Sequence, residues 1–142
     1  MGTNTQLGTN TQHRGGAGRM RVVRLTLPLY CQPPLNEWRR WDWAKRVTLR
    51  KVVAQEMAVA VQTAFGHSRI EPMQKALVTA TYHFPNKSHR NLANYSLKFV
   101  ADALVLHGVL VSDDFKHCEE VVRMGDVETP GRIEIEVEEV GS

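Results

Sequence analysis

The sequence predicts an α+β fold, a small mixed β-sheet with two long helices packed on one face, in the order β-α-β-α-β(β). Short segments rich in β-branched residues alternate along the chain with longer segments of helical periodicity. Pro and Gly residues stand between these segments, where they end strands and helices. The closing segment, residues 132–140, alternates Ile and Val with Glu, which is typical of an antiparallel strand with one buried face.

A single domain accounts for most of the chain. The 142 residues are 42% hydrophobic and 23% charged, which is a globular composition, and a chain of this length buries a sufficient core without disulfides. Residues 2–6 and 8–12 both have the sequence GTNTQ, and Gly-rich residues follow up to position 18. Such a polar segment cannot bury enough apolar surface to fold. We therefore expect a disordered tail over residues 1–19 and one folded domain over residues 20–142.

Periodicity places the expected strands and helices. Alternation and β-branched residues predict strands at residues 20–27, 75–84, 119–124 and 132–140. A helix is predicted from about Trp41 to Phe65, because apolar residues recur on one side of it at Leu49, Val53, Met57, Ala60, Val61 and Ala64. Gly66 ends this helix, and Gly108 follows the end of a second helix that starts near Asn91.

The second helix is apolar on nearly all sides. One side carries Leu92, Phe99, Val100, Ala103 and Leu106, and the other carries Leu97, Ala101 and Val105. We therefore expect burial on more than one side, for example at a dimer interface. A polar line of Asn94, Lys98 and Asp102 runs along it with a spacing of four residues. The simplest interpretation of this line is an exposed ion pair between Lys98 and Asp102.

Two acidic residues, Asp113 and Asp114, follow the short apolar run 109–111. In most proteins an Asp pair of this kind belongs to a turn. Two carboxylates held in a rigid place can also bind Mg²⁺, which prefers oxygen ligands and keeps several waters. A metal bound in this way can activate water for the hydrolysis of a phosphodiester. Both interpretations stay open at this point.

Charge is distributed unevenly along the chain. Residues 1–70 contain 11 Lys or Arg and 3 Asp or Glu, whereas residues 71–142 contain 7 and 12. A basic region of this kind favours a partner of high negative charge. No run of 18 apolar residues and no apolar signal core is present, so we expect no membrane span and a cytoplasmic location. The two cysteines, Cys31 and Cys118, predict neither a disulfide framework nor a zinc site.

Residues 38–51 are strongly basic and are the best candidate for binding a polyanion such as nucleic acid. Six cations lie between positions 39 and 51, opposed by Asp42 alone, and they are Arg39, Arg40, Lys45, Arg46, Arg50 and Lys51. Such side chains neutralise phosphates, and Trp rings can stack on unpaired bases. The three tryptophans, Trp38, Trp41 and Trp43, can equally well fix the entry of the helix to the core. Arg90 is placed to hold a phosphate at the start of the second helix.

Several short motifs follow one another in a recognisable order. They are Leu25-Thr26-Leu27-Pro28, Pro33-Pro34-Leu35-Asn36-Glu37, Trp41-Asp42-Trp43-Ala44, the series Arg90, Asn91, Asn94, Lys98, Asp102-Ala103-Leu104 and Gly108, the pair Asp113-Asp114, and Pro130-Gly131-Arg132 before the closing strand. In order and spacing they resemble the RusA family of Holliday junction resolvases, especially its phage-borne branch. The resemblance covers nearly everything beyond the tail. It implies a homodimeric, Mg²⁺-dependent endonuclease, with Mn²⁺ as a substitute, that makes paired symmetric nicks in four-way DNA junctions during recombination and repair.

The resemblance also assigns roles to residues. Lys98 matches the active-site lysine of the family, Asp114 its last acid and Asn94 its asparagine, whereas Asn91 and Ala93 stand where two early acids are expected. The expected catalytic residues are Asp114, Asp113, Lys98 and Asn91, and the expected metal ligands are Asp114, Asp113, Asn91 and Asp102. The expected DNA-binding residues are Asn36, Trp38, Arg39, Arg40, Lys45, Arg46, Arg50, Lys51, Arg90 and Asn94.

Two further hypotheses remain. Because Asn91 brings no charge, metal affinity should fall, and the same fold could bind branched DNA without cutting it. The third hypothesis is a small basic interaction module unrelated to nucleic acid, in which Asp113 and Asp114 form a turn.

Overall fold

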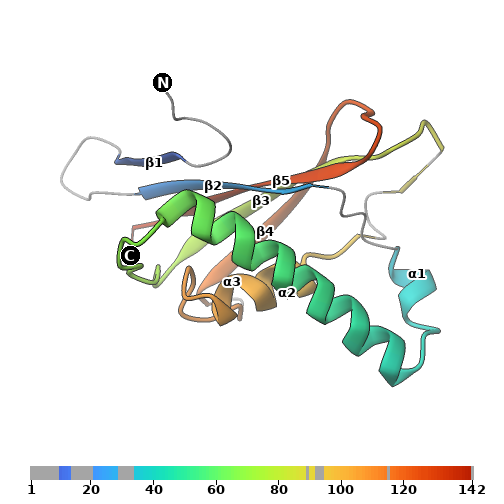
Figure 1. Ribbon diagram of the computed structural model, residues 1–142, viewed down its shortest axis with the longest axis horizontal. Helices are drawn as coiled ribbons and strands as arrows, with labels where there is room; N and C mark the ends of the chain where they lie inside the picture. Colours follow the sequence, from blue (N-terminus) through green and yellow to red (C-terminus); the bar gives the residue numbers. More distant parts are fainter. Residues whose placement is uncertain are drawn as a thin grey trace.

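The computed structural model describes residues 10–13, 21–28, 34–88, 90–91, 95–114 and 116–141. Within these residues, five strands form one mixed sheet in the order β1-β2-β5-β3-β4. The strands are β1 (Asn10–His13), β2 (Arg21–Pro28), β3 (Ala76–His83), β4 (Cys118–Met124) and β5 (Arg132–Glu139). The pairs β1/β2, β2/β5 and β5/β3 are antiparallel, and β3/β4 is parallel. Two helices, α2 (Trp43–Phe65) and α3 (Lys98–Leu106), pack against this sheet (Figure 1), which confirms the predicted α+β class.

The buried face of the sheet is built by strict alternation. In the central strand β5, Ile133, Ile135 and Val137 are almost fully buried, while Glu134, between two of them, is exposed. The pairing register places buried residues of β2 and β3 beside them, so that Ile135 lies between Leu25 and Ala80. An apolar row thus crosses three strands on the side that the helices cover. The prediction of a half-buried antiparallel strand over residues 132–140 is confirmed.

Helix α2 follows the predicted pattern. Its buried residues are Val53, Met57, Ala60 and Val61. Asp42 caps its N-terminus, because the Asp42 side chain accepts a hydrogen bond from the backbone N–H of Lys45 at 2.8 Å. Gly66 ends it with a φ of 57°, a left-handed conformation that suits glycine. The short helix α1 (Leu35–Trp38) precedes it as a separate element.

Helix α3 is shorter than predicted. It starts at Lys98, whereas the sequence predicted a helix from near Asn91, so that prediction was wrong for residue 91 and for residues 95–97. The reason lies in Tyr95 and Leu97, which are both buried two residues apart, a spacing that suits extended chain. The Tyr95 ring packs edge-on against Tyr82 of β3 at 5.6 Å between ring centroids, so this segment contacts the sheet before the helix begins.

The N-terminal part of the chain also differs from the prediction. Residues 10–13 fall in the predicted disordered tail, yet they form β1, which pairs with β2 in antiparallel register from Asn10 opposite Arg24 to His13 opposite Arg21. An edge strand is held by backbone hydrogen bonds, which a polar sequence can make without burying side chains. The other tail residues, 1–9 and 14–19, lie outside the described part of the chain. Within the described part, no helix has the length and hydropathy needed to cross a bilayer.

Candidate functional site

Three of the predicted site residues, Arg50, Asp102 and Asp113, meet at a pocket between α2 and α3. The pocket has a volume of about 440 Å³, and it is lined by Arg50 from α2, by Phe99 and Asp102 from α3, and by Asp113 from the loop that follows α3. Asp102 lies in the second turn of α3, one turn after Lys98. Two carboxyl groups that are eleven positions apart in the sequence therefore share one concave surface with a guanidinium group.

The loop that carries Asp113 is fixed by backbone pairing. Leu110 forms a parallel bridge with Met73, and both residues are almost fully buried. The backbone N–H of Met73 donates to the carbonyl of Val109 at 2.9 Å, and that of Val111 donates to the carbonyl of Met73 at 3.0 Å. Asp113 follows two residues later. Asp113 thus follows closely after a backbone segment that is paired and buried.

Burial, and then the repulsion between neighbouring carboxyl groups, decide the electrostatics of the pocket. Burial raises the pKa of Asp102, and a side-chain hydrogen bond with Asp113 and the negative charge of Asp113 raise it further, against the opposing charges of Lys98 and Arg50. Partial burial also raises the pKa of Glu120 in β4, with added repulsion from Asp113 and Asp102. Three carboxyl groups thus interact with one another here. A bound cation would relieve their repulsion.

Lys98 stands beside this acidic group. Its Nζ atom lies 3.8 Å from Oδ2 of Asp102, and the two side chains are 52% and 31% exposed. The ion pair expected from the sequence is therefore present. An i,i+4 pair of this kind contributes only about 0.3–0.5 kcal/mol. Lys98 is consequently held only weakly by Asp102.

Asp114 is placed differently from Asp113. Its Oδ1 atom accepts hydrogen bonds from the backbone N–H groups of Lys116 and His117 at 3.0 and 3.1 Å, and from Nδ1 of His117 at 2.7 Å. The hydrogen bond from His117 is the largest cause that lowers the pKa of Asp114. Asp114 therefore holds the turn that leads into β4, which is the role expected of an ordinary Asp in a turn. Asp113, rather than Asp114, joins Asp102 in the pocket.

The residues that fit a metal ion are few. Among the described residues, no group of three or more His, Cys, Asp or Glu side chains is placed to hold one. Asp102 and Asp113 remain as a pair of carboxylates, which is the kind of protein ligand set that Mg²⁺ accepts when waters and substrate phosphates complete its shell. Asn91 is exposed, and Asn94 lies outside the described residues. The donor set therefore fits a Mg²⁺ ion held by two carboxylates better than a closed cage.

The predicted DNA-binding cations surround the N-terminal end of α2. Arg39, Arg40, Lys45, Arg50 and Lys51 are all exposed. This end of α2, together with α1, extends beyond the sheet (Figure 1). Asn36 lies in α1, and its side chain is outside the described part.

Arg46 and Trp38 join this basic end to the core. The Arg46 guanidinium lies 5.1 Å from the centre of the Trp38 ring and donates to the carbonyls of Trp38 and Arg39 at 3.2 and 2.7 Å. The Trp38 ring in turn meets Phe99 of α3 edge-on at 5.5 Å. For Trp38 the structure therefore supports the interpretation that the indole fixes the helix entry to the core.

Arg90 is engaged in its own loop. Its guanidinium lies 4.2 Å from the centre of the Phe84 ring and donates to the carbonyls of Asn86 and Ser88 and to Oδ1 of Asn86. These contacts hold the segment between β3 and α3. They also occupy donors that the predicted phosphate contact would need, so the structural role is better supported for this residue.

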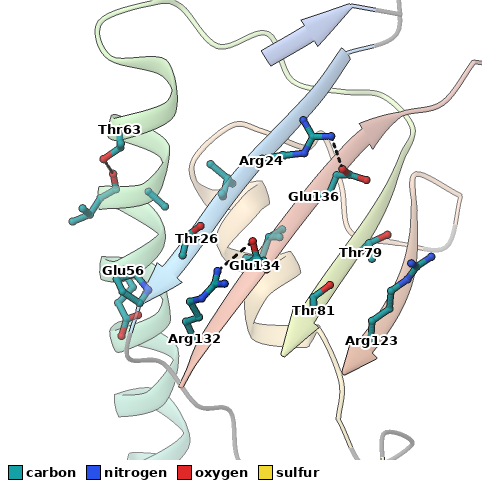
Figure 2. Close-up of a pocket in the computed structure, with 15 residues that line it drawn as sticks. Arg24, Thr26, Glu56, Thr63, Thr79, Thr81, Arg123, Arg132, Glu134 and Glu136 are labelled. Atoms are coloured by element: carbon teal, nitrogen blue, oxygen red, sulfur yellow. Dashed lines mark hydrogen bonds and ion pairs between the residues drawn. The ribbon is translucent and has the colours of Figure 1, made fainter. Parts of the chain in front are cut away.

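A second, larger groove lies on the face of the sheet away from α3. It has a volume of about 1090 Å³, and Figure 2 shows its floor of alternating side chains from β2, β5, β3 and β4, with α2 along one side. Its charges are largely paired within the protein, since Arg24 lies 3.1 Å from Glu136 and Arg132 lies 3.2 Å from Glu134. The sequence did not lead us to predict this groove. Its floor consists of outward-facing residues of the strands, and the alternation of apolar and polar residues in those strands was a signal for it.

A buried histidine, His83, contacts Glu134, one of the residues that line this groove. His83 is 8% exposed, and its Nε2 and Nδ1 atoms lie 2.6 Å from Oε1 of Glu134 and 2.9 Å from the carbonyl of Asp126. It lies at the end of β3 and forms hydrogen bonds with neighbours in the fold.

Comparison with protein-family models and with curated proteins finds no match to this chain. The assignment of a function therefore depends on the geometry described above.

Proposed function

We propose that the protein is a Mg²⁺-dependent, structure-selective endodeoxyribonuclease that nicks four-way junctions or other branched DNA. The observation that carries this proposal is the position of Arg50. Arg50 belongs to the exposed basic end of α2, and it lines the same pocket as Asp102 and Asp113. A DNA backbone that follows the basic surface would be led directly to the acidic pair.

Each residue of the pocket has a distinct part in this proposal. Asp102 and Asp113 would hold the Mg²⁺ ion through their carboxylates. When bound, Mg²⁺ supplies a water nucleophile of lowered pKa and offsets the charge that develops on the phosphodiester. Lys98, close to Asp102 and half exposed, contacts a non-bridging oxygen of the phosphate under attack. Arg50 holds a neighbouring phosphate and fixes the register of the strand.

Asp114 acts indirectly. Its hydrogen bonds to residues 116 and 117 fix the turn that follows Asp113, so Asp114 is a positioning residue here. This assignment replaces the direct catalytic role that the sequence resemblance implied for Asp114. The proposed metal chemistry is the same, but Asp113 instead of Asp114 is the metal ligand that joins Asp102.

Paired nicks would require two such sites on one junction. A homodimer supplies them, and two exposed apolar residues support such an assembly, namely Leu106 of the pocket lining at 68% and Val111 at 42% exposure. Covering them with a second copy would remove apolar surface from water. We propose that the enzyme works in the reducing cytoplasm of a bacterium or of a phage-infected host.

The second candidate is a branched-DNA-binding protein of the same fold that does not cut. Asn91, where the resemblance implies an acid, is exposed, and only two carboxylates line the pocket. A weaker cation site would bind DNA through the basic surface without efficient cleavage.

Incubation with a labelled synthetic four-way junction and Mg²⁺ tests the proposal. We expect symmetric nicks on a denaturing gel from the natural sequence, no nicks from Asp113→Asn, and unchanged nicking from Asp126→Asn. Asp126 is a matched control because it is an exposed Asp that does not line the pocket. A stable, salt-sensitive complex without nicks would support the binding protein instead, and no complex at moderate salt would contradict both candidates.

A further inference from the structure

The three tryptophans of residues 38–43 are in different surroundings. The Trp38 ring is in contact with Arg46 and Phe99, and Nζ of Lys45 lies 4.3 Å from the centre of the Trp41 ring. Trp43 is 78% exposed, and no ring stacking or cation-π contact is found for it among the described residues. Of the three indoles, Trp43 is thus the one whose ring faces solvent.

The setting of Trp43 is strongly basic. It is the first residue of α2, at the end that extends beyond the sheet (Figure 1), and the exposed Arg39, Arg40 and Lys45 lie within four positions of it. An exposed large apolar side chain is an informative observation, because most indoles are at least half covered. Surrounding cations favour a polyanion as the partner that covers it.

We propose that Trp43 is a stacking platform for an unpaired base of branched or single-stranded DNA, and that this contact provides selectivity over duplex DNA. The aromatic faces of bases in a duplex are covered by their neighbours. At a branch point or in a single strand, a base face becomes accessible to an indole. The phosphate contacts of the surrounding cations are similar for all these forms of DNA, so they supply affinity without this selectivity.

A second copy of the chain is a less suitable occupant for Trp43. A symmetric contact through this residue would bring Arg39, Arg40 and Lys45 of two copies together, and like charges at an interface disfavour association. Nucleic acid has the opposite charge and offers flat aromatic faces. The inference rests on the proposed binding of DNA, and it does not depend on cleavage.

Binding measurements on two variants test this inference. Trp43→Leu keeps an apolar side chain of good helix propensity without a π face, and Trp43→Phe keeps a smaller aromatic ring. The probes are a single strand of roughly 15 nucleotides, a duplex of the same length and a four-way junction. We expect Trp43→Leu to weaken binding of the single strand and the junction about tenfold and that of the duplex less than about twofold. Trp43→Phe should restore most of the loss.

Two further readouts separate stacking from charge and from folding. Because no cation is removed, the slope of log K against log salt should stay unchanged in both variants. Tryptophan emission should be quenched by the single strand in the natural protein and much less so in Trp43→Leu, with the same far-ultraviolet circular dichroism for both.

Equal weakening for duplex and single strand, or no weakening at all, would overturn the proposal. A change from dimer to monomer in sedimentation with unchanged DNA affinity would also overturn it, because it would make Trp43 a contact between copies. Absence of nicking by the natural protein would refute the proposed nuclease activity, and the binding results would still test the stacking role of Trp43. Conversely, normal nicking and affinity in Trp43→Leu would refute the stacking role alone.

Discussion

Replacing Asp102 by Asn should abolish cleavage while leaving the fold nearly as stable. The change preserves the shape of the side chain and removes its charge. It loses the ion pair with Lys98, whose 3.8 Å separation and i,i+4 spacing correspond to about 0.3–0.5 kcal/mol. It also removes the burial of a charge and the repulsion from Asp113, a gain of similar size because the Asp102 side chain is still 31% exposed. The free energy of unfolding at pH 7 should therefore change by less than about 0.5 kcal/mol.

The effect on the reaction should be far larger. Asp102 is one of two carboxylates that we assign to the cation, and loss of one group that stabilises transition-state charge typically slows a reaction about 100-fold or more. Single-turnover nicking of a four-way junction measures this rate, and urea denaturation measures the stability. Glu136→Gln is the matched control, because Glu136 is a paired carboxylate on the other face of the sheet. Nicking by Asp102→Asn at the natural rate, or a loss of stability above about 2 kcal/mol, would refute this reasoning.

Three further predictions concern pH, DNA contact and packing. The fold raises the pKa of Asp102 above its usual 3.8, so the folded protein binds this proton more tightly than the unfolded protein does. The free energy of unfolding should therefore fall as pH rises through the window just above pH 4. Urea titrations in which Asp102→Asn shows the same fall would contradict the assignment. Arg50→Ala should lower the salt slope of junction binding by about 1 and slow nicking more than Lys51→Ala does, and equal effects on nicking would argue against a special place for Arg50. A Cβ added at Gly125 would lie 2.4 Å from the His83 ring. Gly125→Ala should therefore lower the free energy of unfolding by about 1–3 kcal/mol. A change below about 0.5 kcal/mol would show that the ring moves easily.

The parts of the fold that periodicity predicted are those where one face is apolar and the other polar. Strand β5 is of this kind, because its apolar spacing records burial directly. In helix α2 the buried residues also recur at helical spacing, although the apolar residues Trp43, Val52 and Val59 are exposed. The start of α3 was mispredicted for the opposite reason. Among the described residues just before α3, Tyr95 and Leu97 are buried, and two apolar positions are too few to show a period that distinguishes a helix from extended chain. The pairing of β1 depends on backbone groups, which leave little trace in a polar sequence.

The candidate site could be predicted only in part. The sequence supplied Lys98, Asp102 and the Asp pair, but adjacency along the chain does not tell which of Asp113 and Asp114 points toward Asp102. A usable signal was His117, whose spacing from Asp114 allows that carboxylate to close a turn. Glu120 was missed because its approach to the pocket depends on the position of β4 at the edge of the sheet.

The most direct test of a cation site at Asp102 and Asp113 is the anomalous scattering of Mn²⁺ soaked into crystals of the protein. We predict a peak in contact with the carboxylates of both residues, with the Lys98 ammonium beside it. No peak at this pocket at millimolar Mn²⁺, or a peak at Asp114 alone, would contradict the account.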